Sequence, residues 1–169
     1  MLPLLSGLQV WKKVKDMLDL KNLAKPFAGL VKGAAPGKFG DYVEHSAVTQ
    51  RLLLHCGPYG QTVVREIYDE HKEYGHTLTG VVLRLTLTID GKEIVMEESG
   101  SVDKPYKLTN KKTGERMNNG ERLKLAISDA HKRCAMRVGL GLHLWAQDDY
   151  FLYNQLEVKN GGSQENKNS

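Results

Sequence analysis

Alternating apolar and polar residues between positions 81 and 97 predict a β-hairpin. Five apolar residues occupy every second position and would share one face: Val81, Leu83, Leu85, Leu87 and Ile89. Asp90-Gly91 follows as a two-residue turn, which pairs Ile89 with Lys92. This register sets Arg84 opposite Glu97 on the outer face and apolar side chains opposite one another on the inner face. Residues 62 to 68 predict a further strand.

Between positions 121 and 138 the apolar period changes to three and four residues, which predicts a long helix. The members of its apolar stripe are Leu123, Ile127, Ala130, Cys134 and Val138. Asn118 is placed to cap the N-terminus, with Glu121 as the capping-box partner. Gly139 stands where a left-handed residue ends a helix.

Two more helices are expected upstream of the hairpin. Ser6 can cap a first helix over residues 7 to 25. Residues 26 to 40 are rich in glycine and proline, which predicts a linker. A second helix is expected to begin at Asp41, with Glu44 as its capping-box partner, and to end near Gly57.

The predicted fold class is α+β: a three-stranded antiparallel β-sheet (a β-β-β-α core) packed on a long basic helix, with an additional N-terminal helix. We expect an N-terminal helix and linker over 1–40, a core over 41–154 and a disordered polar tail over 155–169. The lysine-rich loop over 103–120 is expected to be mobile. With 169 residues, 40% of them hydrophobic, the chain can bury a core of its own.

Charge is unevenly distributed along the chain. Residues 103 to 137 contain ten Lys and Arg against four Asp and Glu, whereas residues 41 to 100 contain five against ten. The formal net charge of +4 therefore conceals a basic and an acidic segment. Helical spacing places Arg122, Arg133 and Arg137 along one edge of the apolar stripe, and Lys132 on its solvent side. A basic helix of this kind favours a polyanion, and nucleic acid above all, over a plain solvated face.

Other classes of protein are less well supported. No apolar run approaches the roughly 18 residues of a membrane span. Two cysteines are too few for a disulfide framework or a zinc ribbon, so a reducing, cytoplasmic environment is expected. The segment GAAPGK fails as a phosphate-binding loop, because Phe39 stands where a magnesium-binding hydroxyl is required.

Three residues of the long helix invite a chemical interpretation. Asp129 precedes Arg133 by four residues and is interpreted as its salt-bridge partner rather than as a catalytic group. His131 and Cys134 are interpreted as a surface histidine and a packed thiol rather than as metal ligands. We therefore expect no catalytic residue, no metal and no cofactor.

The same helix carries a motif. The stretch AISDAHKRCAMRVG, from Ala126 to Gly139, resembles a helix of the single-strand annealing proteins of the Rad fifty-two superfamily, which follows a three-stranded sheet. GLGLHLW and Asp149-Tyr150 extend the match, and so do YVEHSAVTQRLLLHCG and LTIDGKEIVMEESG upstream. The resemblance covers about residues 42 to 150, and the AMRVGLGLHLW ending is closest to phage members.

This resemblance implies a protein that binds single-stranded DNA and anneals complementary strands without ATP, in homologous recombination or repair. It implies phage origin, action in the host cytoplasm, and a homo-oligomer in the form of a ring or helical filament. A nuclease or single-strand-binding protein partner is not identified by the sequence. The N-terminal stripe of Trp11, Val14 and Leu18 is a candidate for subunit contact.

The family's groove cations can be assigned in part. Its Lys-Arg pair falls on Lys132 and Arg133, whereas its next arginine falls on Met136, with Arg137 one position later. The groove arginine of the opening helix has no match, since Ala47 stands near that place. The expected DNA-binding residues are Lys132, Arg133, Arg137, Lys111, Lys112, Arg116 and Arg122.

Two other functions remain open at this point. A double-stranded RNA-binding module shares the order of helix, three strands and helix. A metal-dependent nuclease has weaker support, from Asp41 with Glu70 and Lys72.

Overall fold

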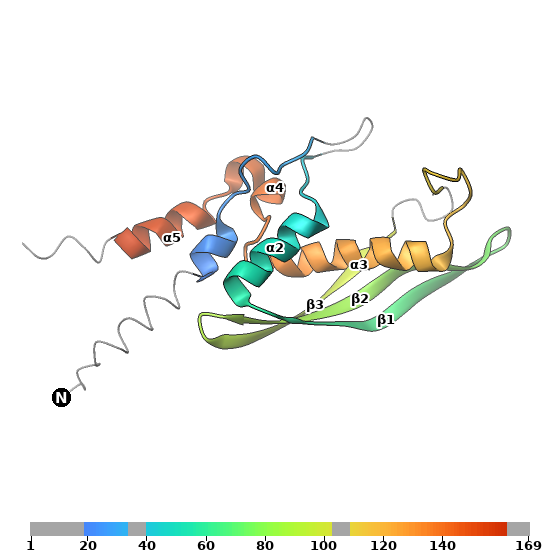
Figure 1. The fold of residues 1–169 in the computed structure, drawn as a ribbon, viewed down its shortest axis with the longest axis horizontal. Helices are drawn as coiled ribbons and strands as arrows, with labels where there is room; N and C mark the ends of the chain where they lie inside the picture. Colours follow the sequence, from blue (N-terminus) through green and yellow to red (C-terminus); the bar gives the residue numbers. More distant parts are fainter. Residues whose placement is uncertain (1–18, 34–39, 103–108, 162–169) are drawn as a thin grey trace, which may run out of the picture. The chain divides into compact units, whose positions relative to one another are not determined.

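The computed structural model describes residues 19–33, 40–102 and 109–161. Its labelled elements run in the order α2, β1, β2, β3, α3, α4, η1 and α5 (Figure 1). The chain forms two compact units. The helical unit comprises the described residues of the ranges 1–58, 88–94 and 135–169, and the sheet unit comprises the described residues of 59–87 and 95–134.

The sheet consists of β1 (Gly60–His71), β2 (Gly75–Ile89) and β3 (Lys92–Ser101), in the order β1-β2-β3. The predicted α+β class with a three-stranded antiparallel sheet is therefore confirmed. Asp90 and Gly91 form the β2–β3 turn with φ of 50° and 72°, as a type I′ turn requires. Arg84 Nε donates to Glu97 Oε1 at 2.7 Å, in agreement with the predicted register.

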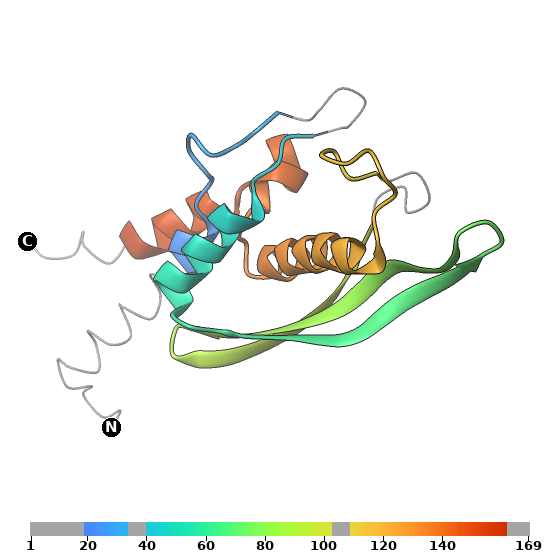
Figure 2. The same ribbon diagram turned by 45° about the vertical axis from the view of Figure 1, so that its right-hand side comes forward.

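Strand β2 is the most buried of the three. Its side chains at Val81, Leu83 and Leu85 are 0% exposed. Strand β1, one of the two edge strands, is exposed along most of its length. The register of the β1–β2 pair shifts between Val63 and Arg65 and again between Ile67 and Tyr68. Figures 1 and 2 both show α3 lying across one face of the sheet.

Helix α3 (Asn119–Met136) begins where the sequence predicts. The backbone N–H of Glu121 donates to Asn118 Oδ1 at 2.9 Å, and the N–H of Asn118 donates to Glu121 Oε2 at 2.9 Å. The capping box is thus closed in both directions. The hydrogen bond from Asn118, followed by one from Asn110, holds the pKa of Glu121 below its usual value.

The predicted stop after α3 is confirmed as well. Gly139 has a φ of 85°, a conformation that glycine adopts without strain. The N–H of Gly139 bonds to the carbonyl of Met136, and the N–H of Leu140 bonds to that of Ala135. These two hydrogen bonds define a Schellman motif.

The buried stripe of α3 is rotated from the predicted one. Ala126, Ala130 and Cys134 are 0% exposed, whereas Leu123 and Ile127 are only half-buried. The cause is a close approach to β3, since a Cβ added to Gly100 would lie 2.2 Å from the carbonyl oxygen of Ala126. Small residues on both elements permit this spacing, so alanines rather than the larger side chains face the sheet.

Helix α2 (His45–Cys56) begins four residues later than predicted. Its N-cap is Glu44, whose side chain makes no capping hydrogen bond. That carboxylate instead pairs with Lys32 Nζ at 2.5 Å, and Lys32 forms a β-bridge with Tyr42. The prediction of Asp41 as the cap is therefore wrong, because the chain is extended before the helix. Gly57 ends the helix with a φ of 70°, as expected.

The start of the predicted linker is packed. Residues 19–24 are helical, and the rest of the predicted first helix, with Trp11, Val14 and Leu18, lies outside the described residues. Phe27 is 6% exposed, and the guanidinium carbon of Arg51 lies 3.8 Å from the centroid of its ring.

The C-terminal segment contains α4 (His143–Ala146), the 3₁₀ helix η1 (Gln147–Asp149) and α5 (Leu152–Gly161). The prediction of disorder from residue 155 is therefore wrong for residues 155–161. Glu157 pairs with Lys21 at 3.3 Å, and the hydroxyl of Tyr150 donates to the carbonyl of Ala24. Tertiary contacts thus stabilise a helix whose polar composition predicts none.

Candidate nucleic-acid interface

Lys132 and Arg133 lie near the C-terminal end of α3 and outside its buried stripe. Arg133 Nε donates to Asp129 Oδ2 at 3.0 Å, which confirms the predicted salt bridge. The same carboxylate oxygen accepts the backbone N–H of Ser101 at 3.1 Å. Asp129 therefore joins the end of β3 to α3 and fixes one side of the guanidinium, whose side chain is 39% exposed.

A further lysine, which the sequence reasoning missed, shares a ridge with Lys132. Lys124 is exposed, and Ser128 and Lys132 follow it at intervals of four residues, so the three side chains lie on one face of α3. The two lysines are separated by about 12 Å along the axis. The four-residue spacing from Lys124 to Lys132 could have identified this lysine from the sequence. It was missed because Lys124 lies outside the motif Ala126–Gly139.

Arg137 follows the last residue of α3 and is exposed. It belongs to the helical unit, within the turn that Gly139 closes. Met136, which stands at the place of the family's arginine, is half-buried.

The described part of the lysine-rich loop, residues 109–118, is held by hydrogen bonds. Thr109 pairs with Arg116 in a β-bridge, and Gly114 has a φ of 73°. Asn110 Nδ2 donates to Glu121 Oε1 at 2.5 Å, which attaches the loop to the capping box of α3. Lys111 and Lys112 are exposed on this turn. Residues 109–118 therefore form a hydrogen-bonded turn attached to α3, and Lys104 and Lys107 lie outside the described residues.

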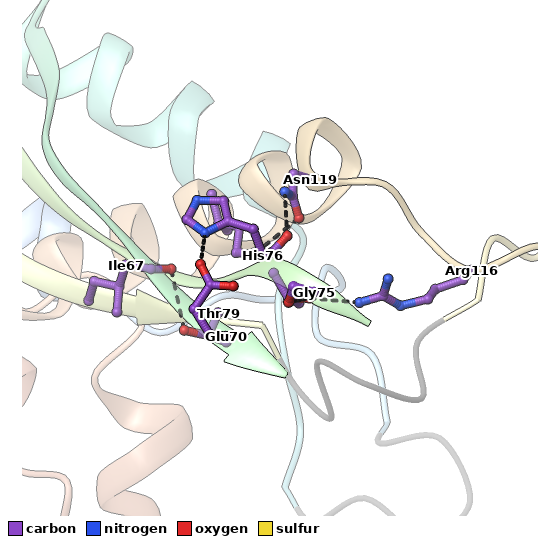
Figure 3. A network of polar contacts seen from close by, with 9 residues as sticks. Ile67, Glu70, Gly75, His76, Thr79, Arg116 and Asn119 are labelled. Carbon is purple, nitrogen blue, oxygen red and sulfur yellow. Dashed lines mark hydrogen bonds and ion pairs between the residues drawn. The ribbon is translucent and has the colours of Figure 1, made fainter. Parts of the chain in front are cut away.

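Arg116 links this turn to the end of the β1–β2 hairpin (Figure 3). Its Nη2 donates to Thr77 Oγ1 at 2.8 Å, and its Nη1 donates to the carbonyl of Tyr74 at 3.4 Å. Its guanidinium carbon lies 4.4 Å from the centroid of the Tyr74 ring. The side chain is nevertheless exposed to solvent.

Asn119 and His76 complete the network drawn in Figure 3. Asn119 Oδ1 accepts the N–H of Leu78 at 3.0 Å, and its Nδ2 donates to the carbonyl of His76 at 3.1 Å. The first residue of α3 is thereby fixed to β2. The ring of His76 pairs with Glu70 and stacks on Tyr68 with centroids 4.1 Å apart.

Two groups of solvent-accessible cations lie near the two ends of α3. One group lies on the turn before α3 and contains Lys111, Lys112 and Arg116; the other contains Lys132 and Arg133 on α3 itself. Thirteen residues separate Asn119 from Lys132, which corresponds to about 20 Å of helix. Lys124 lies on the helix between them.

Arg122 does not belong to either group. Its side chain is 0% exposed, and its Nε donates to the carbonyl of Met117 at 3.0 Å. Its placement at the edge of the apolar stripe was predicted, but the rotation of that stripe toward Gly100 carries Arg122 inside. We therefore leave it out of the proposed interface.

His131 and Cys134 are both buried. The prediction of a surface histidine is wrong, because His131 is 0% exposed and its Nε2 lies 2.8 Å from the hydroxyl of Tyr59. The packed thiol is confirmed, since Cys134 Sγ bonds to the carbonyl of Leu83 at 3.8 Å.

Among the described residues, no group of three His, Cys, Asp or Glu side chains is placed to hold a metal ion. Asp41 and Glu70, which gave the nuclease alternative its support in the sequence, belong to different units.

No helix in the described ranges has the length and apolar character needed to cross a membrane. No protein-family model matches the chain, and no curated protein matches it.

Proposed function

We propose that this protein binds single-stranded DNA through its phosphate backbone and promotes the pairing of complementary strands without ATP. The observation that carries the proposal is the separation of roles on α3. Small residues bury one side of the helix, while Lys124 and Lys132 remain accessible and Arg133 is oriented by Asp129. The turn with Lys111 and Lys112 adds a second group of cations.

Such an arrangement supports annealing by a simple physical route. Duplex formation is favourable once the repulsion between two polyanions is reduced, so no chemical energy source is needed. Cations that hold phosphates leave base edges free to pair, which also predicts little sequence preference. Affinity should decrease steeply with salt, with a slope of roughly 0.7 for each phosphate contact on a single strand.

We extend the proposal to assembly and setting. A homo-oligomer, as a ring or helical filament, would join short basic surfaces into a continuous path for a strand. Recombination or repair in the cytoplasm of a phage-infected host is the setting that the resemblance of Ala126–Gly139 implies.

The proposal is tested with two complementary oligonucleotides that carry a fluorescent donor and acceptor. We expect the protein to accelerate pairing in the absence of ATP and in the presence of a chelator. Lys132→Ala/Arg133→Ala should lose this acceleration while retaining the circular dichroism and thermal unfolding of the wild type. If the wild-type protein binds both strands and pairing is no faster than without protein, the annealing function is refuted.

A double-stranded RNA-binding module is the second candidate, because the order α2, β1, β2, β3, α3 is observed. Competition between duplex RNA and single-stranded DNA of equal length separates the two functions. Preference for the duplex would replace our proposal, and magnesium-dependent cleavage in the same assay would indicate a nuclease.

A further inference from the structure

Arg116 is held in a defined orientation at the end of the β1–β2 hairpin. Hydrogen bonds to Thr77 Oγ1 and to the carbonyl of Tyr74 fix two edges of its guanidinium, and the Tyr74 ring lies 4.4 Å from the guanidinium carbon. The ring itself is stacked against His71, with centroids 4.8 Å apart and an interplanar angle of 23°. The exposed side chain of Arg116 is therefore held in place by two hydrogen bonds and by the Tyr74 ring.

No carboxylate neutralises the charge of Arg116 within the described part of the chain. A guanidinium has five N–H donors, and two of them bind Thr77 and Tyr74. The remaining donors lie on an exposed side chain, in the fork geometry that suits a phosphate.

Two lysines add positive charge near Arg116, while the carboxylate of Glu73 binds the hydroxyl of Tyr74. Lys111 and Lys112 are exposed on the same hydrogen-bonded turn. Adjacent residues of a strand point to opposite faces, so the His76 side chain, with its partner Glu70, lies on the other face from Thr77. The Glu70 carboxylate therefore does not compete with a phosphate at Arg116.

We propose that Tyr74 is a positioning residue that holds Arg116 for contact with a phosphate of single-stranded DNA, so that the β1–β2 turn belongs to the nucleic-acid interface. This inference rests on the proposed function for its ligand, but it concerns binding alone. The ring orients the guanidinium plane, and Thr77 sets its rotation. Neither residue needs to contact DNA.

The experiment is a double-mutant cycle on the full chain, measured by fluorescence anisotropy with labelled oligothymidylate over a range of salt concentrations. Arg116→Ala should weaken binding and reduce the salt slope by about 0.7. Tyr74→Ala should weaken binding about two- to five-fold at low salt, as expected for the loss of an exposed cation–π contact. The double variant should be no weaker than Arg116→Ala, because both changes remove one interaction.

Two conservative variants separate positioning from general effects on folding. Tyr74→Phe keeps the ring and loses the hydroxyl with its hydrogen bond to Glu73, so it should bind as the wild type does if the ring alone positions Arg116. Arg116→Lys keeps the charge but not the planar fork, so it should lose affinity as Tyr74→Ala does. Additive losses in the cycle, or wild-type affinity of Tyr74→Ala or Arg116→Lys, would overturn the inference. If the cycle gives the expected affinities but the protein does not accelerate annealing, the proposed function is refuted and this inference is not. If the wild-type protein does not bind single-stranded DNA, both are refuted.

Discussion

Gly100 of β3 lies against the backbone of Ala126 in α3 so closely that no side chain fits between them. A Cβ at position 100 would be 2.2 Å from the Ala126 carbonyl oxygen and 2.4 Å from the Ala130 nitrogen. Both neighbours are backbone atoms, which cannot move without shifting the helix. This contact sets the distance between α3 and the sheet, and through it the rotation of the helix.

Gly100→Ala should therefore destabilise the protein by about 3 kcal/mol, at the upper end of the usual cost of overpacking. Gly60→Ala is the matched control in the same sheet, because its Cβ would meet only Thr86, with the nearest atom at 3.5 Å, an ordinary contact. Urea denaturation measures both. Equal stability of the two variants would show that α3 is not seated on Gly100.

The buried Arg122 predicts a contrast with the exposed cations. Arg122→Ala should lower the free energy of unfolding by about 2–4 kcal/mol, because it leaves a cavity where a side chain was 0% exposed. Arg122→Met fills most of that volume and should therefore lower the free energy of unfolding by a smaller amount. At temperatures where Arg122→Met remains folded, its affinity for single-stranded DNA should equal that of the wild type; a large loss would return Arg122 to the interface.

The capping box should make the folding stability of the protein depend on pH. Hydrogen bonds from Asn118 and Asn110 lower the pKa of Glu121 in the folded chain below the ordinary value of 4.5. A group with a depressed folded pKa contributes stability above its unfolded pKa and loses it as the pH falls through the folded pKa. The midpoint temperature of thermal unfolding should therefore decrease more steeply below about pH 4.5 for the wild type than for Glu121→Gln. Parallel curves of midpoint temperature against pH would contradict this.

The two thiols should respond differently to alkylation. Burial, followed by the charge of Asp19, raises the pKa of the Cys56 thiol to about 11, so its modification rate should rise about tenfold per unit between pH 7 and pH 10. Because this folded pKa exceeds the unfolded one, Cys56 also disfavours the folded state as the pH rises above about 9. Cys134, at 0% exposure, should react only on unfolding. Mass spectrometry distinguishes the sites, and a rate for Cys56 that levels off near pH 9 would be inconsistent with the burial.

Assembly is tested by light scattering at micromolar concentration with and without oligothymidylate. We expect a species much larger than the 18.9 kDa chain. A monomer under both conditions would contradict the proposed homo-oligomer and leave each cationic surface isolated.

Local patterns predicted the elements whose signals lie within a few residues of one another. The Asp90-Gly91 turn, the box of Asn118 and Glu121 and the stop at Gly139 are all confirmed because each is a short-range backbone requirement. The rotation of α3 could not be predicted in this way. It depends on Gly100, which is 26 residues from Ala126 and becomes its neighbour only in the folded chain.

The same limit applies to the candidate interface. Charge patterning identified Lys132, Arg133 and Arg116, and Arg122 carries the same charge in the same segment. Only packing distinguishes a buried guanidinium from an exposed one. Tyr74 and Thr77 carry no charge and lie about 40 residues from Arg116, so no sequence period connects them with it.

The irregular ladder between β1 and β2 has a consequence for how copies of the chain can meet. An open edge strand is a template on which another strand can pair, and β1 has only β2 as a neighbour among the described strands. The shifts at Val63/Arg65 and Ile67/Tyr68 interrupt its regular spacing and increase its twist. A second chain would find few successive donors and acceptors in step along this edge. We therefore expect the exposed Val63 and Val64 to be less prone to edge-to-edge pairing, and the proposed homo-oligomer to form through another surface.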